Sequence, residues 1–74
     1  MNTPTTLDEA REAGRLAGPM LMAQLAADLS KPAPTPEEAE GYAELGALAG
    51  ERLFVTGRPW NVRTFIQAGR ESVA

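Results

Sequence analysis

The side chains that most often carry out catalysis or bind metal ions are scarce in this chain. It has no cysteine and no histidine, so it lacks the thiol and imidazole groups of most nucleophilic sites and structural zinc sites. Glu40 and Glu44 are one helical turn apart and could share a cation, but they belong to a face whose charges indicate solvation. Gly46 and Gly50 are not followed by the Lys-Ser/Thr pair of a phosphate-binding loop. We therefore expect neither an enzyme nor a bound metal ion or cofactor.

The C-terminal part of the chain carries side chains that can contact nucleic acid. Residues 51–74 hold four basic and two acidic side chains, whereas residues 1–50 hold three basic and eight acidic ones. Arginine and glutamine on one helix face can hold phosphates or read base edges. The side chains with this potential are Arg58, Arg63, Gln67 and Arg70.

Residues 61–70 (NVRTFIQAGR) resemble the recognition helix of excisionase-type and other helix-turn-helix regulators, in which a similar string ends in a glycine and a basic residue. The resemblance implies DNA binding through this helix. The chain departs from that family between Gly50 and Asn61, because this stretch is longer than the usual tight turn between the two helices. A solvated basic face that balances an acidic body is the other interpretation. DNA binding is therefore an alternative function here.

A repeated pattern predicts two similar helices that position the rest of the chain. Residues 12–18 (EAGRLAG) recur 32 residues later as residues 44–50 (ELGALAG). Each copy contains a Gly-x-x-x-Gly step, although glycine inside a helix costs about 0.8–1 kcal/mol relative to alanine. Close contact between helix backbones would compensate for this cost. The four residues that we assign to helix packing are Gly14, Gly18, Gly46 and Gly50.

Capping signals divide the chain into three helices. Thr6 with Glu9, and Thr35 with Glu38, each have the spacing of a capping box. Glycine and proline near residues 57–59 end the second helix, and an asparagine at position 61 begins the third. We predict helices at about 6–29, 36–56 and 61–72, with a proline-rich linker at 30–35.

Two local alternatives remain open. Pro19 lies inside the first predicted helix, which either continues through it with a kink or breaks into two helices at Gly18. The stretch 52–66 contains two segments of β-forming composition, so a short hairpin is the minority interpretation there.

Length and composition indicate one small all-α domain spanning residues 1–74, an antiparallel helical hairpin with a short third C-terminal helix. A chain of this size has a small core and no disulfide. It contains no apolar run of the roughly 18 residues that a membrane span needs, and its start lacks the features of a signal peptide. We expect a cytoplasmic protein. Its richness in Ala, Gly, Arg and Pro suggests a bacterial or phage source.

A second apolar strip lies away from the main packing stripe of the first helix. It comprises Ala13, Leu16, Met20, Ala23 and Ala27, and Leu48 is placed similarly on the second helix. The third helix either covers this strip or leaves it exposed as an interface. The predicted partner interface consists of Ala13, Leu16, Met20, Leu48 and Trp60.

These features favour a small acidic protein–protein interaction module that acts as an accessory regulator, inhibitor or assembly factor. Its partner would be another protein or a second copy of the chain in a homo-oligomer. The alternatives are a helix-turn-helix-like DNA-binding regulator that uses the basic C-terminal helix, and an oligomeric virion or scaffold component.

Overall fold

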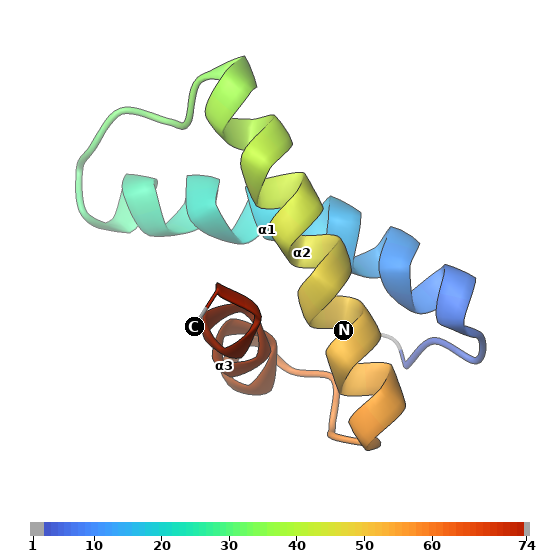
Figure 1. The fold of residues 1–74 in the computed structure, drawn as a ribbon. Coiled ribbons are helices and arrows are strands. Elements are labelled where there is room, and N and C mark those ends of the chain that lie inside the picture. The colour runs from blue at the N-terminus through green and yellow to red at the C-terminus, as the bar shows by residue number, and fades with distance from the viewer. Residues whose placement is uncertain (1–2, 74) are drawn as a thin grey trace.

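The computed structural model describes residues 3–73 and consists of three α-helices. Helix α1 spans Leu7–Asp28, α2 spans Pro36–Thr56 and α3 spans Val62–Val73. Helices α1 and α2 run in opposite directions and cross obliquely, with α3 beside the C-terminal half of α2 (Figure 1). The all-α hairpin with a short third helix is thus confirmed. The β-hairpin alternative within 52–66 is wrong, because α2 continues to Thr56 and α3 starts at Val62.

Side-chain caps fix the start of each helix. The Thr35 hydroxyl accepts a hydrogen bond from the Glu38 amide at 3.2 Å, and the Thr35 amide donates to the Glu38 carboxylate at 3.0 Å, which completes the expected capping box. At α1 the Thr6 hydroxyl accepts from the Glu9 amide, but the Glu9 carboxylate accepts from the Thr5 amide instead of that of Thr6. The first box is therefore shifted by one residue, while the helix still begins where the sequence predicts.

Two helix ends share one backbone motif. In both α1 and α2, the residue after the last turn has a left-handed conformation, and the amides beyond the helix bond back to its last carbonyls. Gly57 occupies this position after α2 with φ 66°, as the sequence predicts. Ser30 occupies it after α1 with φ 55°, although such a conformation disfavours a residue with a Cβ atom. The linker then runs to Thr35 without helix.

Helix α1 is continuous through Pro19. Proline has no amide hydrogen, so this position lacks one hydrogen bond of the helix. Pro19 follows Gly14 by five residues, about 140° around the helix, and so lies away from the face that contacts α2. The alternative of two separate helices is therefore wrong, and α1 is a single helix as predicted for residues 6–29.

The four glycines of the two Gly-x-x-x-Gly steps lie where α1 and α2 meet. All four are buried. A Cβ atom added to Gly14 would lie 2.0 Å from the Gly46 carbonyl oxygen, and one added to Gly46 would lie 2.1 Å from the Gly14 oxygen. Such distances are far inside van der Waals contact, so only glycine allows the two backbones to come this close.

The contacts at this crossing are nearly symmetric. A Cβ atom on Gly18 would meet the carbonyl oxygen of Tyr42, and one on Gly50 would meet that of Ala10. Tyr42 follows Ala10 by the same 32 residues that relate the two glycine pairs. The sequence repeat therefore corresponds to a local two-fold relation between α1 and α2, in which each helix presents the same backbone positions to the other.

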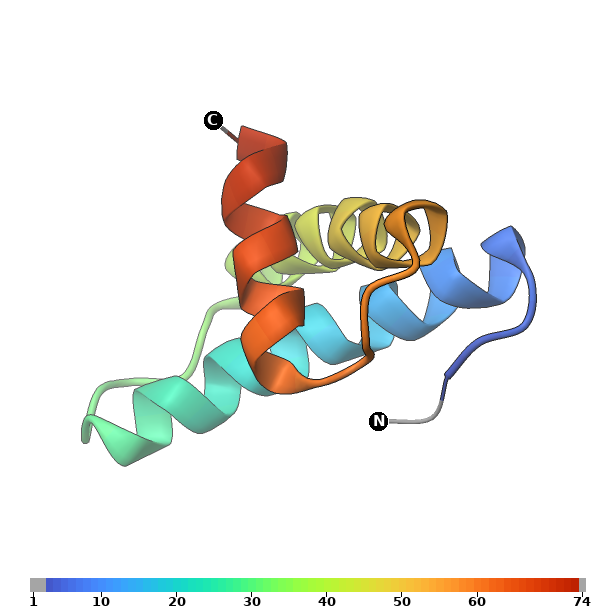
Figure 2. The same cartoon turned by 90° about the horizontal axis from the view of Figure 1, so that it is seen from below.

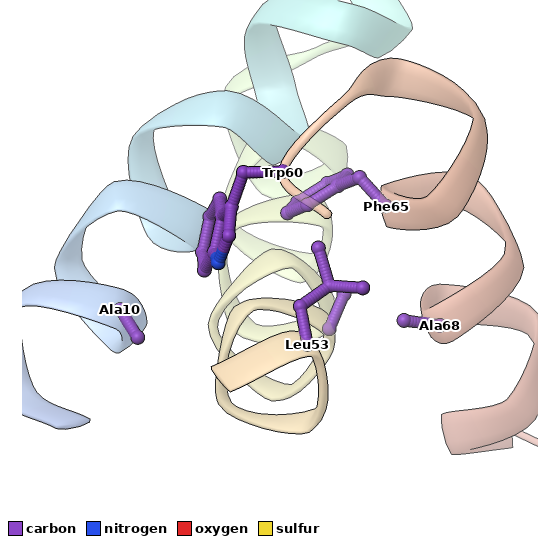
Figure 3. Packing of buried hydrophobic residues seen from close by; sticks show 6 residues of the cluster. Ala10, Leu53, Trp60, Phe65 and Ala68 are labelled. Carbon is purple, nitrogen blue, oxygen red and sulfur yellow. The ribbon is translucent and has the colours of Figure 1, made fainter. Parts of the chain in front are cut away.

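Helix α3 runs across α2 and completes the core beside the crossing (Figure 2). Leu53 of α2 is fully buried, with Phe65 of α3 and Trp60 of the preceding loop above it (Figure 3). The rings of Trp60 and Phe65 are 6.5 Å apart and tilted by 46°. Trp60 fills the space between Ala10 of α1 and the start of α3 (Figure 3). This cluster leaves the opposite face of α1 uncovered.

Ion pairs on the surface link the helices to one another. Arg11 of α1 pairs with Glu51 of α2, and Arg15 pairs with Glu40 at 2.8 Å. These side chains are largely exposed, and exposed pairs contribute about 0–1 kcal/mol each. The glycine crossing and the aromatic cluster therefore carry most of the stability of the fold.

Candidate protein-interaction surface

Two large apolar side chains project into solvent from the outer face of α1. Leu16 is 60% exposed and Met20 is 70% exposed, one helical turn apart. Leu16 lies midway between Gly14 and Gly18, about 200° around the helix from each, so it points away from α2. Helix α3 covers neither side chain. Leu16 and Met20 of the predicted strip are therefore exposed, whereas Ala13 and Ala23 are half-buried.

The surroundings of these side chains are unusual for an exposed helix. No residue between Arg15 and Asp28 is charged, and Gln24 is the one polar side chain among them. A helix that is apolar on all sides is normally buried. The second half of α1 nevertheless extends beyond both α2 and α3, as Figure 1 shows. This part of α1 thus combines exposed apolar side chains with an absence of charge.

A second side of the same helix half contributes to a shallow groove of about 280 Å³. Leu25 of α1 and the C-cap residue Leu29 line it together with Pro32 and Pro34 of the linker and Tyr42 of α2. Lys31 and Glu38 add opposite charges. These residues were not among the site residues predicted from the sequence. The absence of charge between residues 15 and 28 was the signal that could have identified Leu25.

The remaining predicted interface residues do not join this surface. Leu48 lies midway between Gly46 and Gly50 and therefore points away from α1, as Leu16 points away from α2. Leu48 is 49% exposed and borders a separate groove of about 380 Å³ with Val55 of α2 and Ser72 of α3. The structure thus separates two leucines that the sequence analysis grouped together.

Trp60 must also be removed from the predicted interface. It is 8% exposed and belongs to the core cluster, where its indole ring contacts the α1–α2 crossing at Gly50. Large aromatic side chains in a small domain contribute most of the buried apolar area. The indole ring of Trp60 is used for this core packing and is not free to contact a partner. Ala13 is half-buried and packs against the same cluster. Of the five predicted residues, Leu16 and Met20 therefore form the exposed centre.

The predicted nucleic-acid residues do not form one free basic surface. Arg58 donates two hydrogen bonds to the Glu71 carboxylate, at 2.8 and 3.2 Å, and Gln67 donates to the same carboxylate at 3.4 Å. Arg63 and Arg70 are exposed on α3. Two of the four side chains are thus engaged within the fold, and α3 presents isolated arginines instead of a continuous basic face.

Glu71 is the centre of a small charged cluster that holds the end of α3. Besides Arg58, its carboxylate pairs with Arg52 of α2 at 3.1 Å. The hydrogen bond from Arg58 is the main cause that lowers the pKa of Glu71, and the bond from Gln67 and the charges of both arginines act in the same direction against partial desolvation. The cluster therefore has a structural role in joining α3 to α2.

Among residues 3–73, no group of three or more acidic, histidine or cysteine side chains is arranged to hold a metal ion. Within the same part of the chain, no helix is both long enough and apolar enough to cross a bilayer. Comparison of the chain with protein-family models, with curated proteins and with solved structures found no match.

Proposed function

We propose that this chain is a small protein-interaction module that binds its partner through the outer face of the second half of α1. The observation that carries the proposal is the exposure of Leu16 and Met20 on a helix segment without charge. Exposed apolar patches on small domains commonly mark protein interfaces. Methionine suits such a surface because its flexible, polarisable side chain adapts to different partners.

The distribution of charge supports a protein partner over a nucleic acid. Residues 1–50 carry five more acidic than basic side chains, and this part of the chain contains the proposed surface. Acidic surroundings repel phosphates and attract basic or neutral protein surfaces. A DNA-binding regulator that uses Arg63 and Arg70 is the less favoured alternative, since Arg58 and Gln67 already contact Glu71. A role as regulator, inhibitor, assembly factor or scaffold component in a bacterium or phage is compatible with this proposal.

A capture experiment tests the proposed surface. The immobilised chain is offered a lysate of the source organism and, separately, its own purified untagged form. We expect the Leu16→Asp and Met20→Asp variants to lose a protein that the parent retains, because a buried carboxylate in an apolar contact is costly. Circular dichroism checks that both variants remain helical.

Leu48→Asp is the matched control for this experiment. Leu48 follows Leu16 by 32 residues, occupies the equivalent position of the repeat and is similarly exposed, but on the outer face of α2. This variant should bind like the parent. Retention of the partner by all three variants would disprove the proposed surface, and loss of binding in Leu48→Asp alone would move the interface to α2.

A further inference from the structure

The apolar residues on the outer face of α1 have the spacing of a coiled-coil seam. Steps of three and four residues alternate along this face, which is the heptad spacing of positions that interlock between two helices. The seam consists of Leu16, Met20, Ala23 and Ala27. Ala13 continues this spacing but packs against the core cluster, so it is not part of the seam. We infer that the partner of this seam is a second copy of the same chain, with the two α1 helices packed antiparallel about a two-fold axis. This inference rests on the function proposed above and names its partner.

The sizes of the seam residues are complementary when the helix is paired with itself in this direction. Placing the two-fold axis beside the midpoint between Leu21 and Met22 sets Met20 opposite the partner's Ala23, and Leu16 opposite the partner's Ala27. Each large side chain then faces a small one, so the layers can interlock without voids or overlap. A parallel, in-register pair would instead place Met20 against Met20 and Ala23 against Ala23, which leaves poorly filled layers.

Charge also favours this self-pairing. The positions flanking the seam include Ala17, Pro19, Gln24 and Ala26, and none is charged. Two chains of net charge −3 therefore meet here without bringing like charges together along the seam. Asp28, the nearest charged residue beyond this stretch, accepts a hydrogen bond at its carboxylate from the Gln24 amide one helical turn before it.

The ends of the two helices complement each other as well. In the antiparallel pair, the acidic N-terminal part of one α1 lies beside the C-terminal end of the other. Glu12 then comes level with the partner's Lys31, just beyond the end of that helix. Lys31 is the one lysine of the chain and is exposed. Antiparallel helices also align their dipoles favourably.

The surface is accessible without any change in the fold. Helix α2 contacts the opposite side of α1 through Gly14 and Gly18, and Leu16 and Met20 are already in solvent. A contact that uses the same patch on both copies is self-limiting and gives a closed dimer instead of a fibre.

Sedimentation velocity across micromolar to millimolar concentrations tests the inference. The parent should shift from monomer towards dimer as its concentration rises. Leu16→Asp and Met20→Asp should weaken the dimer by about tenfold or more, while Leu48→Asp should associate like the parent. A parent that stays monomeric at millimolar concentration would overturn the inference, and so would equal loss of association in Leu48→Asp.

A size-swap series tests the register. Met20→Ala leaves a void and Ala23→Met brings two methionines together, so each variant alone should dimerise more weakly than the parent. The double variant Met20→Ala/Ala23→Met restores one large and one small residue in each layer and should recover most of the affinity. A double variant weaker than both single variants would rule out this register. Both substitutions are on the outer face of α1, so all three variants should keep the helicity of the monomer.

The two proposals fail in different ways. If the parent is monomeric but Leu16→Asp and Met20→Asp lose a captured foreign protein, the interaction surface stands and the second copy is wrong. If the parent dimerises but Leu16→Asp and Met20→Asp do not weaken the dimer, both the seam and the proposed surface are wrong.

Discussion

At the scale of single residues, glycine determines how closely the two long helices approach. Gly14 and Gly46 face each other so tightly that an added methyl group would overlap a carbonyl oxygen of the other helix. The backbone of a helix cannot move aside as a flexible side chain can. The whole hairpin would have to separate to accept either methyl group.

We therefore predict that Gly14→Ala and Gly46→Ala each destabilise the fold by about 3 kcal/mol or more, because separation of the helices loses contacts along the entire crossing. A small domain has a total stability of about 3–5 kcal/mol, so either variant should be largely unfolded at room temperature. Urea denaturation followed by circular dichroism measures the effect.

Gly41 provides the control for this prediction. It lies within α2, away from both ends, and is exposed to solvent. A Cβ atom added to it would have no neighbouring atom within 4 Å. Gly41→Ala should stabilise the fold by about 0.5–1 kcal/mol, since alanine is the better helix former. Equal effects at positions 14 and 41 would show that helix propensity, and not close approach, explains the glycines.

At the scale of the helices, the sequence predicted nearly every boundary because short-range chemistry decides it. The Thr35–Glu38 capping box, Gly57 and Asn61 act within a few residues, and the structure has each of them in the expected role. The left-handed Ser30 could not be predicted, since serine carries no specific signal for that conformation. The continuity of α1 through Pro19 agrees with the single helix that the sequence predicts at 6–29, since Pro19 lies away from the face that contacts α2.

Ser30 and Gly57, the left-handed residues after α1 and α2, allow a paired test of how these helices end. Ser30→Gly should stabilise the chain by about 0.5–1 kcal/mol, and Gly57→Ala should destabilise it by about 1 kcal/mol, because a Cβ atom is unfavourable at positive φ. Thermal unfolding of the two variants measures both changes. The two substitutions must change the stability in opposite directions. A loss of stability in Ser30→Gly would contradict the strain that we assign to the positive φ of Ser30.

The attachment of α3 should depend on pH through Glu71. Its pKa in the folded chain is lowered, chiefly by the hydrogen bond from Arg58. A carboxyl group with a lowered pKa stabilises the fold above its unfolded pKa of about 4.3, and this stabilisation is lost as the pH falls through the folded value. Lowering the pH through this window should therefore loosen α3 from α2.

Thermal unfolding of the parent and of Glu71→Gln between neutral and strongly acidic pH tests this dependence. The parent should be the more stable at neutral pH, and the difference should vanish once the carboxyl group is protonated. Glu44→Gln removes an exposed carboxylate from α2 and serves as control. If the parent and Glu71→Gln still differed in thermal stability at the lowest pH, the shape of the Glu71 side chain and not its charge would hold α3 in place.

At the scale of the whole molecule, the candidate site was only partly predictable. Periodicity placed Leu16 and Met20 away from the packing stripe, and both are exposed. The same method grouped them with Leu48, because a helical wheel does not show how separate helices are oriented. Trp60 was added as a large aromatic side chain of the kind that anchors interfaces. The crossing at the glycines turns Leu16 and Leu48 to opposite sides, and the loop before α3 folds Trp60 into the core. Those two facts depend on tertiary structure.

Self-association would also make the stability of the whole molecule depend on its concentration. A partner that binds the folded but not the unfolded chain raises the free energy of unfolding by mass action. If two copies pair through α1, the thermal midpoint of the parent should rise with concentration, whereas that of Met20→Asp should rise less over the same range. Differential scanning calorimetry over a wide concentration range measures both.

The single tryptophan gives an independent control for this last measurement. Trp60 is buried within one chain and lies on the inner side of α1, away from the seam. Its fluorescence should report unfolding but not pairing, so the emission of the folded state should not change with concentration below the transition. A concentration-dependent shift of that emission would mean that the contact between copies involves the core cluster around Trp60 and not the outer face of α1.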